Sequence, residues 1–168
     1  MKILYSFVGN VCSGKSTVSE IVAKKHSIAL YSIDEYRIKH NAVLISEEWA
    51  AWDDLKNGIS KENIAILESS GISQNINEIY SLFDKVIIIM MDCHVDVLFQ
   101  RINEREQSNY PKVPCWWNRK NEPMSESKIN ELDSKLKSLI KANYAYSTDK
   151  MPIDKIIKDI STVILNAI

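Results

Sequence analysis

The feature that most constrains the fold of this chain is a glycine loop near its start, G-N-V-C-S-G-K-S-T, at residues 9–17. The loop follows a short, β-rich apolar run and precedes a stretch whose apolar residues recur at helical spacing. A loop of this form directs successive backbone N–H groups at an anion beside the positive end of the helix. The sequence therefore predicts a phosphate-binding loop at the carboxyl end of a first strand.

The residue types within the loop indicate what it holds. Gly9 and Gly14 permit a tight backbone path, Lys15 reaches terminal phosphates, and Ser16 offers a hydroxyl to Mg²⁺. We therefore expect ATP and Mg²⁺ as cofactors, and Lys15 as a catalytic group. The residues expected to bind the nucleotide here are Gly9, Asn10, Val11, Cys12, Ser13, Gly14, Lys15, Ser16 and Thr17.

Apolar runs and amphipathic stretches alternate along the rest of the chain. Strands are expected at 2–8, 28–33, 63–68, 85–91 and 143–148, and helices after the loop and at 34–44, 46–58, 75–83, 94–106, 129–140 and 153–164. Such alternation favours parallel strands joined by helices. The expected fold class is α/β, a three-layer sandwich around a five-stranded parallel sheet, in one domain over 1–168.

Composition limits the classes of partner. The chain has 168 residues, 45% hydrophobic and 26% charged, with a formal net charge of −1. A chain of this charge is not built as a polyanion binder, so contact with nucleic acid would need a local patch. The apolar run at 86–91 is too short to cross a bilayer. Three cysteines without metal-ligand spacing, and no signal-peptide pattern, favour a cytoplasmic protein without membrane contact.

A second candidate site follows the second expected strand, in "YSIDEYR". Ligands of open α/β sheets bind at the carboxyl ends of strands. Asp34 could accept the proton of a hydroxyl acceptor, and Arg37, one helical turn later, could hold an anionic group of that acceptor. The alternative is a helix N-cap at Asp34 with an ordinary surface arginine.

Together these motifs resemble the small P-loop kinases of the nucleoside-monophosphate-kinase-like superfamily, over essentially the full length. "DEYR" is similar to the acceptor-site D-x-x-R of 5′-hydroxyl polynucleotide kinases. There the aspartate is the general base and the arginine contacts a phosphate of the acceptor. The chain lacks the D-G-F-P-R motif of adenylate kinases and carries "ILESSGISQN" in its place.

The resemblance implies further site residues. Glu68 ends the third strand, where the superfamily carries an acidic residue near Mg²⁺ or the acceptor; the alternative is a solvated glutamate. Arg101 and Arg105 resemble the R-x-x-x-R of a lid that closes over the γ-phosphate, unless they only pair with Glu104 on the helix surface. The lid is then at about 106–124, with Arg119 as a further candidate. Thr148 and Asp149 resemble the loop beside the adenine ring.

Two aromatic groups could stack a nucleobase or simply pack: Trp49 with Trp52, and Tyr110 with Trp116 and Trp117, the latter among Lys112, Arg119 and Lys120.

Three functions remain open. The first is an ATP-dependent kinase acting on a 5′-hydroxyl of a nucleic-acid end or nucleotide, favoured by "DEYR" and by the basic, tryptophan-bearing lid. The second is a kinase of a nucleoside, nucleoside monophosphate or other small metabolite, favoured by the near-neutral charge. The third is a nucleotide-binding module without phosphotransfer. The sequence leaves the oligomeric state open.

Overall fold

The computed structural model describes residues 1–108, 112–114 and 124–167. Its centre is a sheet of five strands in the order β2-β3-β1-β4-β5, all paired in parallel. The strands are β1 (Ile3–Gly9), β2 (Ala29–Ser32), β3 (Ile64–Glu68), β4 (Lys85–Asp92) and β5 (Tyr144–Ser147). The expected five-stranded parallel α/β sandwich is confirmed.

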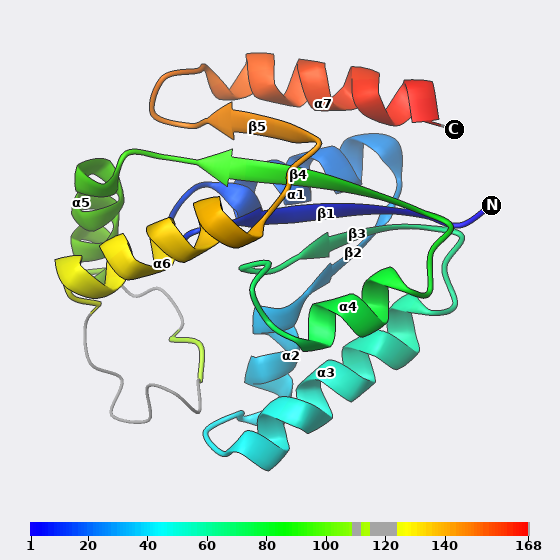
Figure 1. Cartoon of the computed structure of the whole chain (residues 1–168), viewed down its shortest axis with the longest axis horizontal. Helices are drawn as coiled ribbons and strands as arrows, with labels where there is room; N and C mark the ends of the chain where they lie inside the picture. Colours follow the sequence, from blue (N-terminus) through cyan, green and yellow to red (C-terminus); the bar gives the residue numbers. More distant parts are fainter. Residues whose placement is uncertain (109–111, 115–123, 168) are drawn as a thin grey trace.

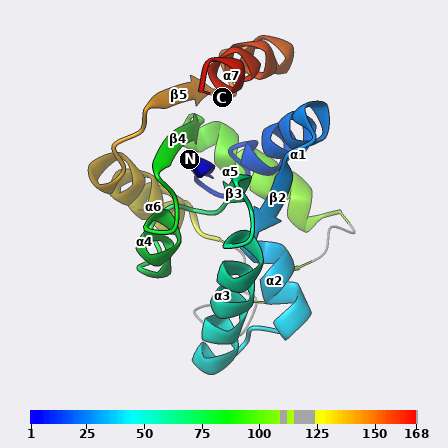
Figure 2. The same ribbon diagram turned by 90° about the vertical axis from the view of Figure 1, so that its right-hand side faces the viewer.

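Helices cover both faces of this sheet (Figures 1 and 2). On one face lie α1 and α7, and on the other lie α3 and α4; α2 joins β2 to α3, while α5 and α6 flank the carboxyl edge. Their bounds are α1 (Lys15–His26), α2 (Ile33–His40), α3 (Ile45–Ile59), α4 (Asn75–Tyr80), α5 (Val95–Glu106), α6 (Glu126–Leu139) and α7 (Ile153–Ala167).

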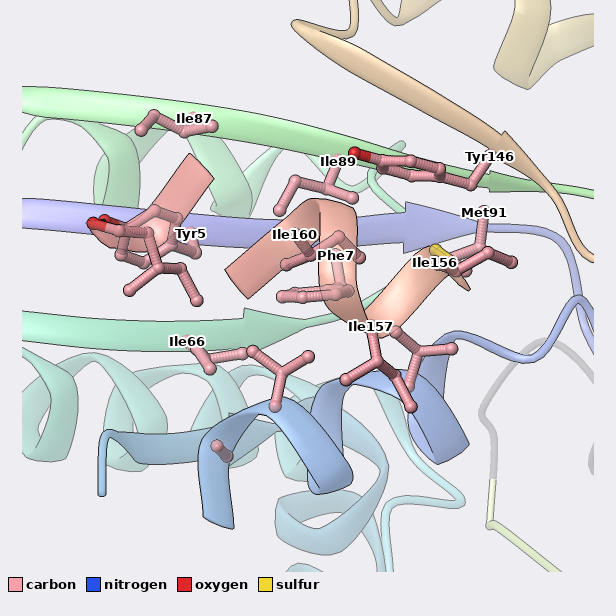
Figure 3. Packing of buried hydrophobic residues seen from close by; sticks show 14 of the residues in the cluster. Tyr5, Phe7, Ile66, Ile87, Ile89, Met91, Tyr146, Ile156, Ile157 and Ile160 are labelled. Carbon is pink, nitrogen blue, oxygen red and sulfur yellow. The ribbon is translucent and has the colours of Figure 1, made fainter. Parts of the chain in front are cut away.

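Two apolar cores form because successive side chains of a strand point to opposite faces. Tyr5 and Phe7 of β1 pack with Ile160 of α7 on one face (Figure 3). Leu4, the neighbour of Tyr5 along the strand, packs with Leu55 of α3 on the other face. The strands are therefore buried on both faces. The loops and side chains at the carboxyl edge of the sheet are the parts that can still bind a ligand.

The observed helix bounds differ from the expected ones in two informative places. Gly58, expected to end a helix, lies within the last turn of α3. A Cβ atom there would lie 2.9 Å from Cε1 of Tyr31 and 3.2 Å from the hydroxyl of Tyr36, so the glycine makes room for these rings. α2 begins at Ile33 with Ser32 as its N-cap, so Asp34 lies in the first turn, and the alternative of an N-cap at Asp34 is wrong.

The predictions of a single domain over 1–168 and of a lid at 106–124 stay predictions, and much of that lid lies outside the described residues. In the part of the chain that the structure describes, no helix combines the length and the apolar character required to span a membrane.

Candidate active site

The loop between β1 and α1 has the backbone path of an anion cradle. Gly14, the N-cap of α1, has φ of 90°, and Cys12 has φ of 57°, both in the left-handed region. Gly9 is required by space as well, because a Cβ atom there would lie 2.4 Å from the backbone oxygen of Met91. Since the loop leads directly into the N-terminus of α1, the N–H groups of the first helical turn and the helix dipole both favour a bound phosphate.

Asn10 supports the loop from within the protein and contributes no side chain to its outer face. It is buried, its amide donates to the backbone oxygen of Ile129 (3.2 Å), and its side-chain oxygen accepts from the Val11 N–H (2.8 Å). Ser13 is likewise fully buried. Both residues, predicted to bind nucleotide, can therefore do so only through their backbone.

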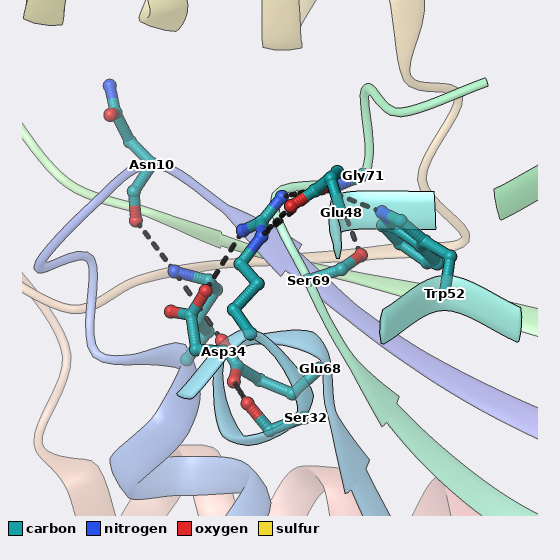
Figure 4. Close-up of polar contacts among 10 residues, drawn as sticks. Asn10, Ser32, Asp34, Glu48, Trp52, Glu68, Ser69 and Gly71 are labelled. Atoms are coloured by element: carbon teal, nitrogen blue, oxygen red, sulfur yellow. Dashed lines mark hydrogen bonds and ion pairs between the residues drawn. The ribbon is translucent and has the colours of Figure 1, made fainter. Parts of the chain in front are cut away.

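Lys15 and Glu68 connect this loop to the neighbouring strand. The Lys15 ammonium lies 3.5 Å from a carboxylate oxygen of Glu68 and 3.3 Å from the backbone oxygen of Asn10. The other Glu68 oxygen accepts a hydrogen bond of 2.5 Å from the Ser32 hydroxyl (Figure 4). Glu68 is only 3% exposed, so the alternative of a solvated strand-end glutamate is wrong.

Magnesium would be held by few protein groups. Among the described residues, no group of three or more His, Cys, Asp or Glu side chains could hold a metal ion. Mg²⁺ in phosphotransfer sites typically takes one or two protein oxygens and completes its octahedron with phosphates and waters. The Ser16 hydroxyl at the cleft, with Glu68 nearby beside Lys15, fits that mode of binding.

Asp34 and Arg37 belong to a network that the sequence reading missed in part. Arg37 donates to Asp34 (3.0 Å) and, through Nε and Nη2, to Glu48 of α3, with its shortest contact at 2.6 Å. The Trp52 indole N–H donates to the same carboxylate (2.9 Å; Figure 4). Burial acts to lower the pKa of the Arg37 guanidinium, but the hydrogen bonds and charges of Glu48 and Asp34 outweigh it and raise that pKa.

Arg101 and Arg105 of α5 face the phosphate loop. Arg101 donates to the backbone oxygen of Cys12 (3.2 Å) and to the hydroxyl of Thr148 (3.1 Å), and Arg105 contacts Cys12 Sγ (3.8 Å). Glu104 instead accepts from Gln100 (2.9 Å). For Arg101 the surface salt-bridge alternative is therefore wrong.

Thr148 and Asp149 follow β5 but lie differently. The Thr148 hydroxyl donates to the backbone oxygen of Ser13 (2.9 Å), so it connects the loop after β5 to the phosphate loop. Asp149 accepts from Ser147 (2.9 Å) and does not line the cleft. Although burial acts to raise the pKa of the Asp149 carboxyl, hydrogen bonds from Ser147 and backbone N–H groups lower it overall.

One cleft of about 1340 Å³ joins these groups. Its walls include most of the predicted site residues, namely Gly9, Val11, Cys12, Gly14, Lys15, Ser16, Thr17, Asp34, Arg37, Glu68, Arg101, Arg105 and Thr148. Residues that the sequence reading missed also line it, among them Ser32, Glu48, Ser69, Ser70, Ser73 and Lys128. The "ESSG" string at the end of β3 carried a signal for two of them, because polar residues at the carboxyl end of a parallel strand face the ligand site.

The tryptophans of α3 lie outside this cleft. Trp52 is 4% exposed, packs in the core and donates to Glu48, so it packs and does not stack a nucleobase. Trp49 lines a separate hollow of about 270 Å³ over α3 and α4. The second predicted aromatic group (Tyr110, Trp116, Trp117) and Arg119 and Lys120 fall outside the described residues. Lys112 is described, lines the cleft, and lies 3.7 Å from Glu106.

Comparisons with known proteins agree with the fold. No family model matches the chain. Its sequence is 23% identical to shikimate kinase of Aquifex aeolicus over 163 residues, covering 91% of this chain and 90% of that protein.

Among solved structures, a putative kinase from Chloroflexus aurantiacus superimposes with a TM-score of 0.70 at 16% identity, covering 96% of this chain and 97% of that one. Shikimate kinase from Acinetobacter baumannii, in complex with shikimate, gives a TM-score of 0.65 at 17% identity, with 99% and 94% covered. These similar proteins are kinases, and the chain has the P-loop kinase fold of the shikimate kinase type. The predicted resemblance to P-loop kinases is confirmed at this level, without specific support for polynucleotide kinases.

Proposed function

We propose that this chain is a small-metabolite kinase that transfers the γ-phosphate of ATP to a hydroxyl group of its acceptor. The observation that carries the proposal is the single cleft that runs from the phosphate loop to Asp34. Phosphoryl transfer requires an in-line hydroxyl, a phosphate cradle and neutralised charge, and little covalent chemistry from the protein.

Each residue of the cleft has a role in the transfer that follows from its position. The loop N–H groups and Lys15 hold the phosphates; the Ser16 hydroxyl would hold Mg²⁺, which when bound would supply positive charge against the phosphates. Arg101 and Arg105 stand over the loop, where charge develops on the transferred group. Asp34 orients the acceptor hydroxyl and takes its proton late in the transfer.

A small acceptor fits the observations better than a nucleic-acid end. The sequence relative and several structural neighbours are named as kinases of small hydroxyl compounds, shikimate kinases and a gluconokinase. The net charge of −1 offers no general attraction for a polyanion. The 5′-hydroxyl of a nucleic acid or nucleotide is the second candidate, and it depends on the D-x-x-R spacing of Asp34 and Arg37.

The test is transfer of γ-labelled phosphate from ATP and Mg²⁺ to sugars, polyols, hydroxy acids, nucleosides and 5′-hydroxyl oligonucleotides. Lys15→Ala should abolish transfer with the fold intact, whereas Lys61→Ala, on the exposed surface away from the cleft, should not. Asp34→Asn should lower transfer by about 10²–10⁴-fold, the usual worth of a general base, and Asp53→Asn serves as its control. Full transfer by Lys15→Ala would refute the assignment, and labelling of oligonucleotides alone would establish the second candidate.

A further inference from the structure

We propose that the acceptor end of the cleft selects a neutral polyol, and that Glu48 sets this selection by occupying and neutralising Arg37. The inference rests on the proposed kinase function and names the acceptor class of the same site. It reverses the expectation from sequence that Arg37 holds an anionic group of the acceptor.

The first argument is the geometry of Arg37. Its Nε donates to both oxygens of Glu48 (2.9 and 3.2 Å), its Nη2 donates to Glu48 (2.6 Å), and its Nη1 donates to Asp34 (3.0 Å). Trp52 donates to Glu48 in turn and fixes the carboxylate in place. The planar fork that would grip a carboxylate or phosphate of a ligand already grips a carboxylate of the protein.

The second argument is the local charge. Among described residues, the cleft wall built from 30–48 and 68–73 contains one cation, Arg37, against four carboxylates, Asp34, Glu35, Glu48 and Glu68. Glu68 is balanced by Lys15. An anionic group close to Arg37 would lie beside Asp34 and Glu48, which repel it, so the guanidinium offers it little net attraction.

The third argument is the chemistry of the remaining wall. Four serines line this region, Ser32, Ser69, Ser70 and Ser73. Hydroxyl and carboxylate oxygens both form hydrogen bonds with hydroxyl groups of a ligand, so a ligand with several hydroxyl groups forms more of these bonds and binds more tightly. A wall of serines and carboxylates therefore suits a polyhydroxyl compound without charge.

The facing wall, as far as the structure describes it, contains two further lysines that could compete with Arg37 for an anionic acceptor. On α6, Lys135 is paired with Glu131 (2.6 Å), and Lys128 also lines the cleft. Lys128 is the competing partner to test for a carboxylate-bearing acceptor. The variant Lys128→Gln separates that case from a role for Arg37.

The decisive experiment compares acceptors in pairs that differ by one carboxylate, such as glucose with gluconate, and a cyclic polyol with the corresponding cyclic hydroxy acid. Apparent kcat and KM are measured with saturating ATP and Mg²⁺ for wild type, Glu48→Gln and Glu78→Gln. The last is the same substitution on the exposed surface, where Glu78 pairs with Lys56 outside the cleft. We expect wild type to favour the neutral member. Glu48→Gln should shift the ratio of kcat/KM about tenfold or more toward the acid, through KM, because a neutral amide neither balances the charge of Arg37 nor repels an anionic acceptor.

Each outcome decides a different question. A wild type that favours the acid, with the preference removed by Arg37→Met or by Lys128→Gln, overturns the inference and leaves the kinase function standing. An unchanged ratio in Glu48→Gln also overturns it. No transfer to any acceptor, with ATP turnover that Lys15→Ala leaves unchanged, refutes the proposed function and this inference with it.

A second measurement does not depend on finding the acceptor. Inorganic sulfate is titrated into the complex with Mg²⁺ and ADP, which occupies the phosphate loop, while the Trp52 indole N–H signal is followed by NMR. Because that N–H donates to Glu48, it reports directly on the pair. Sulfate should shift the signal in Glu48→Gln and not in wild type at the same concentration; a shift in wild type that Arg37→Met abolishes contradicts the inference.

Discussion

The ion pair between Arg37 and Glu48 permits a sharp prediction about stability. The side chains are 17% and 6% exposed, and the three hydrogen bonds between them are charge-assisted. Removing one partner of a buried pair leaves the other charge uncompensated and typically costs about 3–5 kcal/mol. We expect Arg37→Met to lose about 3 kcal/mol, the lower end, because the Trp52 N–H still donates to Glu48.

The matched variants make the reasoning specific. Glu48→Gln removes the charge but keeps an acceptor for Arg37, which also retains Asp34, so its loss should be only about 1–2 kcal/mol. In the double variant Arg37→Met/Glu48→Gln no buried carboxylate is left unpaired. It should therefore be more stable than Arg37→Met alone, although it carries one more substitution.

The assay is urea unfolding at pH 7, followed by circular dichroism, with the free energy of unfolding taken from the midpoint and slope. A loss below about 1 kcal/mol for Arg37→Met would show that the pair is solvated. Strictly additive losses in the double variant would contradict the coupling. Either result would also weaken the argument that Arg37 is unavailable to an anionic acceptor.

Three further predictions follow from other contacts. Gly9→Ala should unfold at lower urea and bind ATP poorly, because its Cβ would meet the backbone oxygen of Met91, which cannot move away as a side chain would; the same unfolding curves and a nucleotide titration measure both. Arg101→Met should lower kcat by about 10²–10³ with little change in nucleotide affinity, as expected for a group that acts on the transition state; an equal loss in affinity would mark it as a ground-state clamp. Burial and the hydrogen bond to Glu62 raise the pKa of Tyr31 from 10.0 to about 12. The folded state therefore favours the neutral phenol, so the contribution of Tyr31 to the free energy of unfolding is present below pH 10 and is lost as pH rises toward 12. Tyr31→Phe should flatten the curve of unfolding free energy against pH in that range. An unchanged slope would contradict the raised pKa of Tyr31.

The sequence by itself determined the features that depend on neighbours along the chain. The glycine loop could be read because its backbone path, its lysine and its serine all lie within 9–17. Alternation of apolar strands with amphipathic helices was sufficient for the parallel sheet, because strand and helix periods are local properties. Asp34 and Arg37 were found as candidates because the end of a strand and the spacing of one helical turn are also visible locally, whereas Glu68, Arg101 and Arg105 were candidates through the resemblance to P-loop kinases.

Only the tertiary structure decided which of these groups meet. Ser32 lies opposite Glu68 because β2 pairs with β3 in that register, and Thr148 reaches the phosphate loop because β5 pairs with β4 at the same edge. Glu48, eleven positions after Arg37, becomes its partner because α3 folds back against α2. Contacts of this kind depend on strand order, register and helix packing, which are set by the whole core and not by any short stretch. For that reason the sequence located Arg37 at the acceptor site, but only the fold determined that Glu48 already neutralises its charge.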